Sequence, residues 1–396
     1  MCPAGHADYM EIYSIGTLMD LELTKEHKML RESVAHFIKK ENPFDRVREL
    51  KKDPLGYTKK IWKKMARLDW MGLIFPEEFG GSGMDFSYVM VLLEEFGKGL
   101  LPEPWISTVL LGGNLVLMGG SDEQKEEILP LICEGKLFMA LAYLEDGGGY
   151  DTRYCTTRAV KNDQGFSISG KKIFVTDGCA ADKFIISART SQGISDGEGI
   201  TLFILPKKAE GLKITPLKTM DGRNAAIFDL DNVQVSCDDI IGIQDKGHSI
   251  LAEAVDQATI GLCAEMAGGM ETALNITVRH LTDRIQFGKP IGSFQATQHK
   301  AADMFIQKEL ALSSVYYATA SIAENIKEKM QVISTAKAKC SSAYLDITKT
   351  AVQLHGAFGF TNESDISLFI KRAKVTDVLF GDAGYHQKRY ASLMGY

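Results

Sequence analysis

The sequence of 396 residues lacks the cysteine spacings that are typical of a metal site or a disulfide framework. Its seven cysteines are an odd number, are widely dispersed and include no CxxC pair. Such a distribution favours reduced thiols over paired ones. We therefore predict no metal site, and we expect a cytoplasmic protein.

Long apolar runs are missing as well. No uninterrupted run approaches the ~20 residues that a helix needs to cross a bilayer. The first residues contain Asp8 and Glu11 and show no basic region followed by an apolar core, so they do not resemble a signal peptide. We expect no membrane span and interpret residues 1–18 as an N-terminal extension.

An excess of positive charge is also absent. The net charge is -6 and the isoelectric point is about 5.8. Nucleic-acid phosphates are bound by clustered Lys and Arg, so we do not expect a nucleic acid as the main partner. Apolar residues make up 45% and charged residues 24% of the chain, which is typical of a globular protein, and the length allows two or three domains.

Hydrophobic periodicity divides the chain into three regions. Residues 19–137 alternate charged and apolar positions at helical spacing, and Ser121–Gln124 forms a capping box that marks the start of one helix. Residues 138–241 contain short apolar runs separated by turns, which predicts a compact antiparallel β domain. The helical period returns over residues 242–396 and predicts bundle helices. The expected fold class is α+β.

Four stretches resemble motifs of the acyl-CoA dehydrogenase family, whose subunits consist of an N-terminal helical domain, a middle β domain and a C-terminal four-helix bundle. The stretches are Tyr143–Asp151, Gly170–Gly178, Arg284–Met304 and Gln353–Thr361. The third is the most specific because the match is continuous over its whole length. The resemblance implies an FAD cofactor, an acyl-CoA substrate, an electron-transferring flavoprotein as the acceptor, and a dimer or tetramer of identical or different subunits.

The resemblance also implies roles for individual residues. It places Phe174 against the isoalloxazine ring, the Thr176 hydroxyl at the flavin N5 edge, and Arg284 on the pyrophosphate of a flavin held by the neighbouring subunit. A planar guanidinium suits phosphate oxygens. His355 is interpreted as structural or as lining the cofactor site. The residues assigned to FAD are Tyr143, Leu144, Gly149, Phe174, Thr176, Arg284, Phe287, Gln295, Gln353 and Gly356.

The catalytic base of the family is missing from both positions where it usually occurs. Removal of a proton next to a thioester carbonyl requires a base. The family's aromatic-Glu-Gly-Thr motif aligns with Phe380–Ala383, which puts Gly381 at the position of the glutamate, and the alternative glutamate aligns with Ala258. Neither glycine nor alanine can accept a proton.

Several explanations stay open. Asp382, one residue further along, is the first candidate base. In the second explanation a companion subunit supplies the glutamate, as in heteromeric family members of steroid-side-chain and dicarboxylic-acid degradation. In the third, a cyclic or unsaturated acyl-CoA reacts with a base elsewhere in the acyl pocket, where Glu103, Tyr385 and Asp256 are the acids within reach. A different class of function is a non-catalytic interaction subunit that binds flavin or acyl-CoA.

Overall fold

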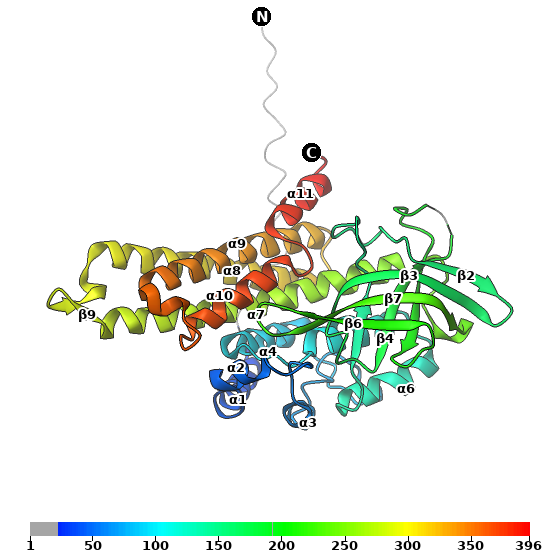
Figure 1. Ribbon diagram of the computed structural model, residues 1–396, viewed down its shortest axis with the longest axis horizontal. Coiled ribbons are helices and arrows are strands. Elements are labelled where there is room, and N and C mark those ends of the chain that lie inside the picture. The colour runs from blue at the N-terminus through cyan, green and yellow to red at the C-terminus, as the bar shows by residue number, and fades with distance from the viewer. Residues whose placement is uncertain (1–22, 192) are drawn as a thin grey trace, which may run out of the picture.

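The computed structural model describes residues 23–191 and 193–396, so the predicted extension at residues 1–18 lies outside the described residues. A helical region comes first, a β-sheet follows, and a second helical region ends the chain (Figure 1). The α+β fold class is thereby confirmed. None of the helices in the described part of the chain is long and apolar enough to span a membrane.

The described part of the first region contains six α-helices, a short 3-10 helix and a π-helix of eight residues. The predicted capping box starts α6, because Ser121 Oγ accepts from the Gln124 amide at 3.2 Å and Gln124 Oε1 accepts from the Ser121 amide at 3.1 Å. The elements are α1 (Lys25–Glu41), α2 (Phe44–Leu50), α3 (Lys59–Ala66), η1 (Glu77–Phe79), α4 (Phe86–Gly99), η2 (Ile106–Gly113), α5 (Asn114–Gly119) and α6 (Asp122–Cys133).

The middle region forms one sheet in the order β6-β7-β3-β2-β4-β5-β8, with β1 added beside β4. Most pairs are antiparallel, as expected. The pairing of β1 with β4 is parallel, because the hairpin of β2 and β3 intervenes before the chain returns beside β1. The strands are β1 (Met139–Ala142), β2 (Arg158–Asn162), β3 (Gly165–Thr176), β4 (Lys183–Arg189), β5 (Ile200–Pro206), β6 (Leu212–Lys218), β7 (Asn224–Val235) and β8 (Ile240–Ile241), and the turn η3 (Cys237–Asp239) precedes β8.

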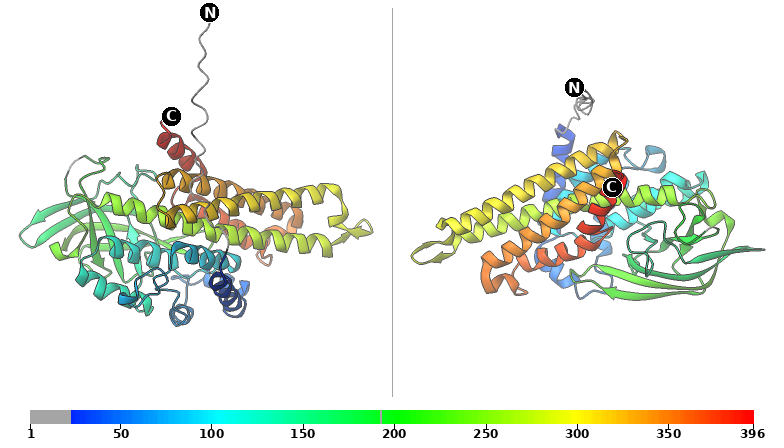
Figure 2. Two further views of the ribbon diagram at one scale, coloured as in Figure 1. Left: turned by 180° about the vertical axis from the view of Figure 1, so that it is seen from behind. Right: turned by 90° about the horizontal axis from the view of Figure 1, so that it is seen from above.

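The last region is a four-helix bundle of α7 (His248–Asp283), α8 (Gln295–Ala323), α9 (Lys329–His355) and α10 (Ile366–Val378), and α11 (Ala383–Leu393) packs on α9. A hairpin of β9 (Ile285–Gln286) and β10 (Lys289–Pro290), followed by η4 (Ile291–Ser293), connects α7 to α8, and η5 (Gly356–Phe360) follows α9. Figure 2 shows the sheet at one end of the molecule and the bundle extending away from it.

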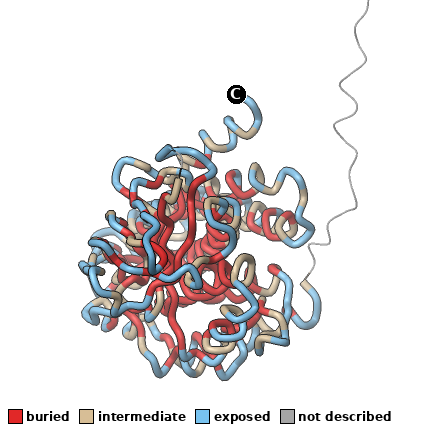
Figure 3. Tube along the Cα trace, turned by 90° about the vertical axis from the view of Figure 1, so that its right-hand side faces the viewer, coloured by how far each residue is buried: buried red, intermediate tan, exposed pale blue. Residues whose placement is uncertain are grey.

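Two glycines allow α4 and α7 to pack with their backbones in contact. A Cβ at Gly97 would lie 1.8 Å from the Glu265 carbonyl oxygen, and one at Gly268 would lie 1.8 Å from the Glu94 carbonyl oxygen. The N-terminal helices and the bundle therefore share one hydrophobic core, and a second core lies within the sheet. The buried segments gather in the centre of the molecule in Figure 3.

Candidate active site and cofactor groove

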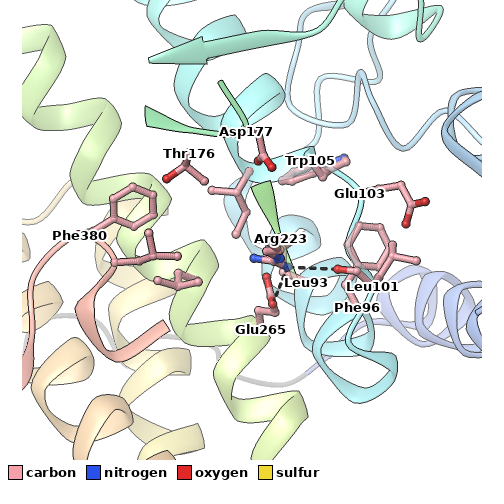
Figure 4. Close-up of a pocket in the computed structure, with 13 residues that line it drawn as sticks. Leu93, Phe96, Leu101, Glu103, Trp105, Thr176, Asp177, Arg223, Glu265 and Phe380 are labelled. Atoms are coloured by element: carbon pink, nitrogen blue, oxygen red, sulfur yellow. Dashed lines mark hydrogen bonds and ion pairs between the residues drawn. The ribbon is translucent and has the colours of Figure 1, made fainter. Parts of the chain in front are cut away.

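A buried cavity lies where the N-terminal helices, the sheet and the bundle meet (Figure 4). Thr176 at the end of β3 and Phe380 after α10 both line it, so two motifs that are far apart in the sequence contribute to one site. The other lining residues are Leu93, Phe96, Leu101, Glu103, Trp105, Ile106, Asp177, Arg223, Leu262, Glu265 and Leu379.

The backbone at the end of β3 is irregular around Thr176. Phe174 and Asp177 have φ angles of 47° and 58°, a conformation that is costly for residues other than glycine and that recurs at functional sites. The register of β3 with β7 shifts between Lys172 and Val175, and such bulges redirect side chains. A second register shift lies between Ile168 and Gly170 of the same strand.

The stretch Tyr143–Asp151, which we call the glycine-rich segment, joins β3 at this bulge. The Ile173 amide donates to the Leu144 carbonyl oxygen at 2.8 Å, which brings Leu144 close to Phe174 in space. Tyr143 is buried, and burial raises the pKa of its hydroxyl. Gly149 has a φ of 58° and no heavy atom near the position of a Cβ, so its backbone is open to a ligand.

A buried ion pair beneath the glycine-rich segment has no signal in the sequence. Lys172 Nζ donates to Glu145 Oε1 at 2.6 Å, and both side chains are almost fully buried. The backbone amides of Thr156 and Thr157 also donate to the Glu145 carboxylate. Burial alone would raise the pKa of Glu145, but Lys172 and these hydrogen bonds outweigh it and lower that pKa to about 2. The pair fixes the start of the glycine-rich segment relative to β3.

The loop at Gly381 has no room for a larger side chain. Gly381 has a φ of 108°, and a Cβ there would lie 2.4 Å from Tyr385 Cδ1 and 2.8 Å from His386 Nε2. Two side chains of α11 therefore close the position at which the resemblance predicts a glutamate.

Two buried groups hold this loop in place. Lys337 Nζ donates to the carbonyl oxygens of Thr376, Asp377 and Gly381 at 3.0, 2.9 and 2.7 Å. His386 Nε2 lies 3.0 Å from the Phe380 carbonyl oxygen, to which it donates. Burial, and then Lys337, lowers the pKa of His386 to about 3, so its imidazole is neutral. Sequence reasoning missed both roles, because each depends on contacts between separate helices.

Asp382 caps a helix in this structure. Its side chain accepts from the Tyr385 amide at 2.7 Å at the start of α11, an ordinary N-cap arrangement. Asp382 does not line the cavity beside Thr176. Its role as the base is thus unsupported by its position.

The other three candidate acids lie in different surroundings. Asp256 is held by Arg389 in a bidentate pair at 2.7 and 2.6 Å, and Tyr385 packs on Tyr150 with ring centroids 5.2 Å apart. Glu103 alone lines the cavity, where it pairs with Arg46. Burial, only partly offset by Arg46, raises the pKa of Glu103.

A network of charges on one side of the cavity was not predicted. Glu265 Oε1 accepts from Arg223 at 2.7 Å and from Arg372 at 2.6 Å, and Arg372 also donates to Asp221 at 2.6 Å. Asp177 accepts from Ser107 Oγ at 2.6 Å. Burial raises the pKa of Asp177 to about 6 despite this hydrogen bond. The wall is ionic here and apolar beside Phe380.

A second site, an open groove of about 1290 Å³, brings together Arg284, Gln353 and Gly356. Gly356 has a φ of 65° and open space at its Cβ position. His355 stacks on His280 at 4.2 Å, and both of its ring nitrogens are buried without a hydrogen-bond partner in the described part of the chain. Burial, and then His280, lowers the pKa of His355 to about 4. A guanidinium, an open backbone and unpaired imidazole nitrogens fit the diphosphate and nucleotide end of FAD.

Phe287 and Gln295 do not line this groove. Phe287 lies in the β9–β10 hairpin with a φ of 56° and is 90% exposed. Gln295 is exposed at the first position of α8. Both stand near the groove along the chain and face solvent in the single chain.

The groove and the cavity are too far apart to share one FAD within a chain. Leu262 of α7 lines the cavity, and Arg284 follows α7 directly, 22 residues later. At 1.5 Å per residue this is about 33 Å along the helix, which is longer than an FAD molecule. Within one chain, Thr176 and Arg284 therefore lie at separate sites.

Comparison with known proteins covers nearly the whole chain. The N-terminal, middle and C-terminal domains of acyl-CoA dehydrogenases match residues 24–136, 140–233 and 245–392. A probable acyl-CoA dehydrogenase of Bacillus subtilis, YngJ, is 31% identical over 91% of this chain and 95% of its own length. CarC, a subunit of the caffeyl-CoA reductase-Etf complex of Acetobacterium woodii, is 30% identical over 92% of this chain and 97% of its own length.

The fold is also that of a solved structure of the steroid acyl-CoA dehydrogenase Tcur3481-Tcur3483. That structure is 25% identical, covers 93% of this chain and 98% of its own, and has a TM-score of 0.85. The matches confirm that the protein is an oxidoreductase, and a solved structure of PigA with the same fold is an FAD complex. This chain belongs to the acyl-CoA dehydrogenase family.

Proposed function

We propose that this chain is a subunit of an FAD-dependent dehydrogenase that desaturates an acyl-CoA thioester at its α and β carbons, and that a companion subunit supplies the base. The observation that carries the proposal is the closed loop at Gly381. A glutamate there would collide with Tyr385 and His386, whose positions are supported by α11.

The proposed cofactor site is shared between subunits. Phe174 and Thr176 would lie along the flavin ring of one FAD, and the groove of a neighbouring subunit would hold its diphosphate through Arg284. When bound, FAD supplies the acceptor for the hydride that leaves the β carbon. The chain's own contribution is to orient the thioester beside Thr176 and to exclude water, which strengthens hydrogen bonds to the thioester oxygen.

Two of the carboxylates that line the cavity, Glu103 and Glu265, are held in ion pairs, which favours a base from outside this chain. Glu103 is paired with Arg46, and Glu265 with Arg223 and Arg372. Neither carboxylate could turn toward a substrate without breaking its contacts with these guanidinium groups. The steroid enzyme with a two-part designation, Tcur3481-Tcur3483, is consistent with assembly from two kinds of chain.

A second candidate function is desaturation or elimination by this chain alone with a base inside the pocket. Asp177 favours it, because that carboxylate lines the cavity next to Thr176 and its pKa of about 6 suits a general base near neutral pH. The base is active when deprotonated, so the rate would rise with pH through about 6. Replacement Asp177→Asn would then reduce the turnover rate by at least about 100-fold.

Anaerobic mixing experiments separate the two functions. We expect the purified chain to be yellow, to bind acyl-CoA, and to keep its flavin oxidised until a glutamate-bearing relative encoded nearby is added. The measurement is flavin absorbance during titration with a saturated acyl-CoA. Bleaching by the chain alone would contradict the heteromer and direct attention to Asp177, whereas a colourless chain that binds no acyl-CoA would indicate a structural subunit.

Replacement Arg284→Ala is expected to weaken FAD retention by about 10- to 100-fold, because it removes a charge-assisted contact to phosphate. Arg279→Ala is the matched control, since Arg279 is exposed on the last turns of α7 and does not line the groove. The ratio of flavin to protein after gel filtration and dialysis gives the answer. Equal flavin content in both variants would refute the assigned contact.

We also propose that an electron-transferring flavoprotein accepts the electrons. The relative CarC is named as a subunit of a reductase-Etf complex, which supports this acceptor. Steady reduction of an added electron-transferring flavoprotein by the complete complex is the expected result, and transfer only to oxygen would contradict it.

A further inference from the structure

Arg223 separates the buried cavity from a second, open cleft. Arg223 lines the cavity beside Thr176 and also lines a cleft of about 710 Å³ together with Lys51, Lys52 and Lys218. We call this second space the basic cleft and define it by these four residues. The turn between β6 and β7 forms one of its walls, and the segment after α2 forms the other.

The charge of the basic cleft is unbalanced. Its lining contains four cations and one carboxylate, Asp53. Arg223 is paired with Glu265, but the Lys51 side chain forms no ion pair or hydrogen bond with any residue that the structure describes. Asp53 accepts from the Leu55 amide at 2.7 Å and is exposed. The cleft thus offers an ammonium group that is half-buried and has no counter-ion.

The Arg223 side chain is common to the linings of the cavity and the basic cleft. Arg223 Nη2 donates to the Leu101 carbonyl oxygen at 3.1 Å and to Glu265, on the side of the cavity away from Phe380 (Figure 4). Its Nε is buried and has no partner in the described residues. Beside it, the Asp177 amide donates to the Asn224 carbonyl oxygen at 3.0 Å, and Asn224 Nδ2 lies 3.4 Å from Asp177 Oδ1. Arg223 therefore lines both spaces and retains an unused donor.

We propose that the acyl group of the substrate ends in an anionic group, a carboxylate, which Arg223 and Lys51 bind where the cavity meets the basic cleft. This inference rests on the proposed function, because it assumes that the thioester lies beside Thr176. The apolar side of the cavity suits methylene groups. A hydrocarbon end would leave Arg223 Nε unpaired and would gain little against ionic neighbours, whereas a carboxylate supplies two acceptor oxygens.

The pKa of Lys51 is consistent with a binding site for an anion. Burial, and then Lys371, lowers the pKa of Lys51 to about 8, and Arg372 and Arg48 act in the same direction while Asp221 opposes them. Asp53, Lys52 and Lys218 face the same cleft. A carboxylate bound beside Lys51 would favour the protonated amine. Carboxylate binding should therefore take up protons near pH 8 and weaken above it.

The test compares two CoA thioesters of equal chain length. Isothermal titration of the FAD-loaded protein with adipyl-CoA and with hexanoyl-CoA measures the effect of a distal carboxylate directly and needs no turnover. We expect adipyl-CoA to bind at least about tenfold more tightly. Equal affinities would overturn the inference and leave the proposed function intact, while binding of neither thioester would overturn both.

Single substitutions show which residues produce the preference for adipyl-CoA. Lys51→Met removes an unpaired, half-buried ammonium and is expected to reduce the preference for adipyl-CoA about threefold to tenfold without changing hexanoyl-CoA affinity. Arg223→Met should abolish the preference, and Lys51→Met serves in its place if the loss of the Arg223–Glu265 pair prevents folding. Lys213→Met, an exposed position on β6 outside the cleft, is the matched control. An unchanged preference in Lys51→Met would contradict the proposed site.

Discussion

Replacement Lys172→Met is expected to lower the free energy of unfolding by about 3–5 kcal/mol at neutral pH, because it leaves Glu145 buried without its counter-charge. Glu145 and Lys172 are almost fully buried, and their 2.6 Å contact joins the glycine-rich segment to β3. Urea unfolding followed by circular dichroism measures the loss. The same variant should retain less flavin, since this segment leads to Leu144 and Gly149.

The double variant Lys172→Met with Glu145→Gln provides the control. It removes both charges, so it should recover most of the stability that the single variant loses. If the double and single variants lost equal stability, the charge pair would not explain the effect.

The pH dependence of unfolding gives a second check on this pair. In the wild type the pKa of Glu145 lies below its usual 4.5, at about 2, so its stabilising contribution is complete above pH 4.5 and is lost as the pH falls toward 2. In Lys172→Met the buried carboxylate has no cation, so acid relieves the burial of its charge. The difference between wild type and variant should therefore shrink as the pH falls from 7 to 4.

Replacement Gly381→Glu is expected to destabilise the protein by about 2–4 kcal/mol and to yield no autonomous dehydrogenase. The cost combines a left-handed backbone with overpacking against Tyr385 and His386. Urea unfolding measures the loss of stability, and anaerobic titration with acyl-CoA tests for autonomous dehydrogenase activity. A variant with wild-type stability that bleaches its flavin without a partner would refute the closed loop and the heteromer together.

Gly384→Ala is the matched control for Gly381. Gly384 lies within α11, and its added Cβ would approach only Asp382 Oδ1, at an ordinary 3.4 Å. Alanine favours a helix over glycine by up to about 1 kcal/mol, so this variant should be as stable as the wild type or slightly more stable. Combining Gly381→Glu with Tyr385→Ala should recover part of the lost stability, because it removes the ring that lies 2.4 Å from the new Cβ.

Local patterns in the sequence were sufficient for the outline of the fold. The capping box of Ser121 and Gln124 depends only on neighbouring residues, and α6 starts where it predicts. Periodicity likewise separated helices from strands, since it reports which face of an element is buried. It could not show that β1 pairs in parallel with β4, because strand pairing depends on where the chain returns in space.

The full set of residues that form the site could be identified only from the tertiary structure. The sequence by itself determined the resemblance to the family motifs and led to the prediction that Gly381 stands where a glutamate is expected, because both depend on residue identity. Only the tertiary structure decided that Tyr385 and His386 fill the vacant position, that Lys172 neutralises Glu145, and that Arg223 divides a cavity from a basic cleft. The physical reason is that burial, charge pairing and steric exclusion arise between residues that are distant in sequence, and no local pattern records which of them meet.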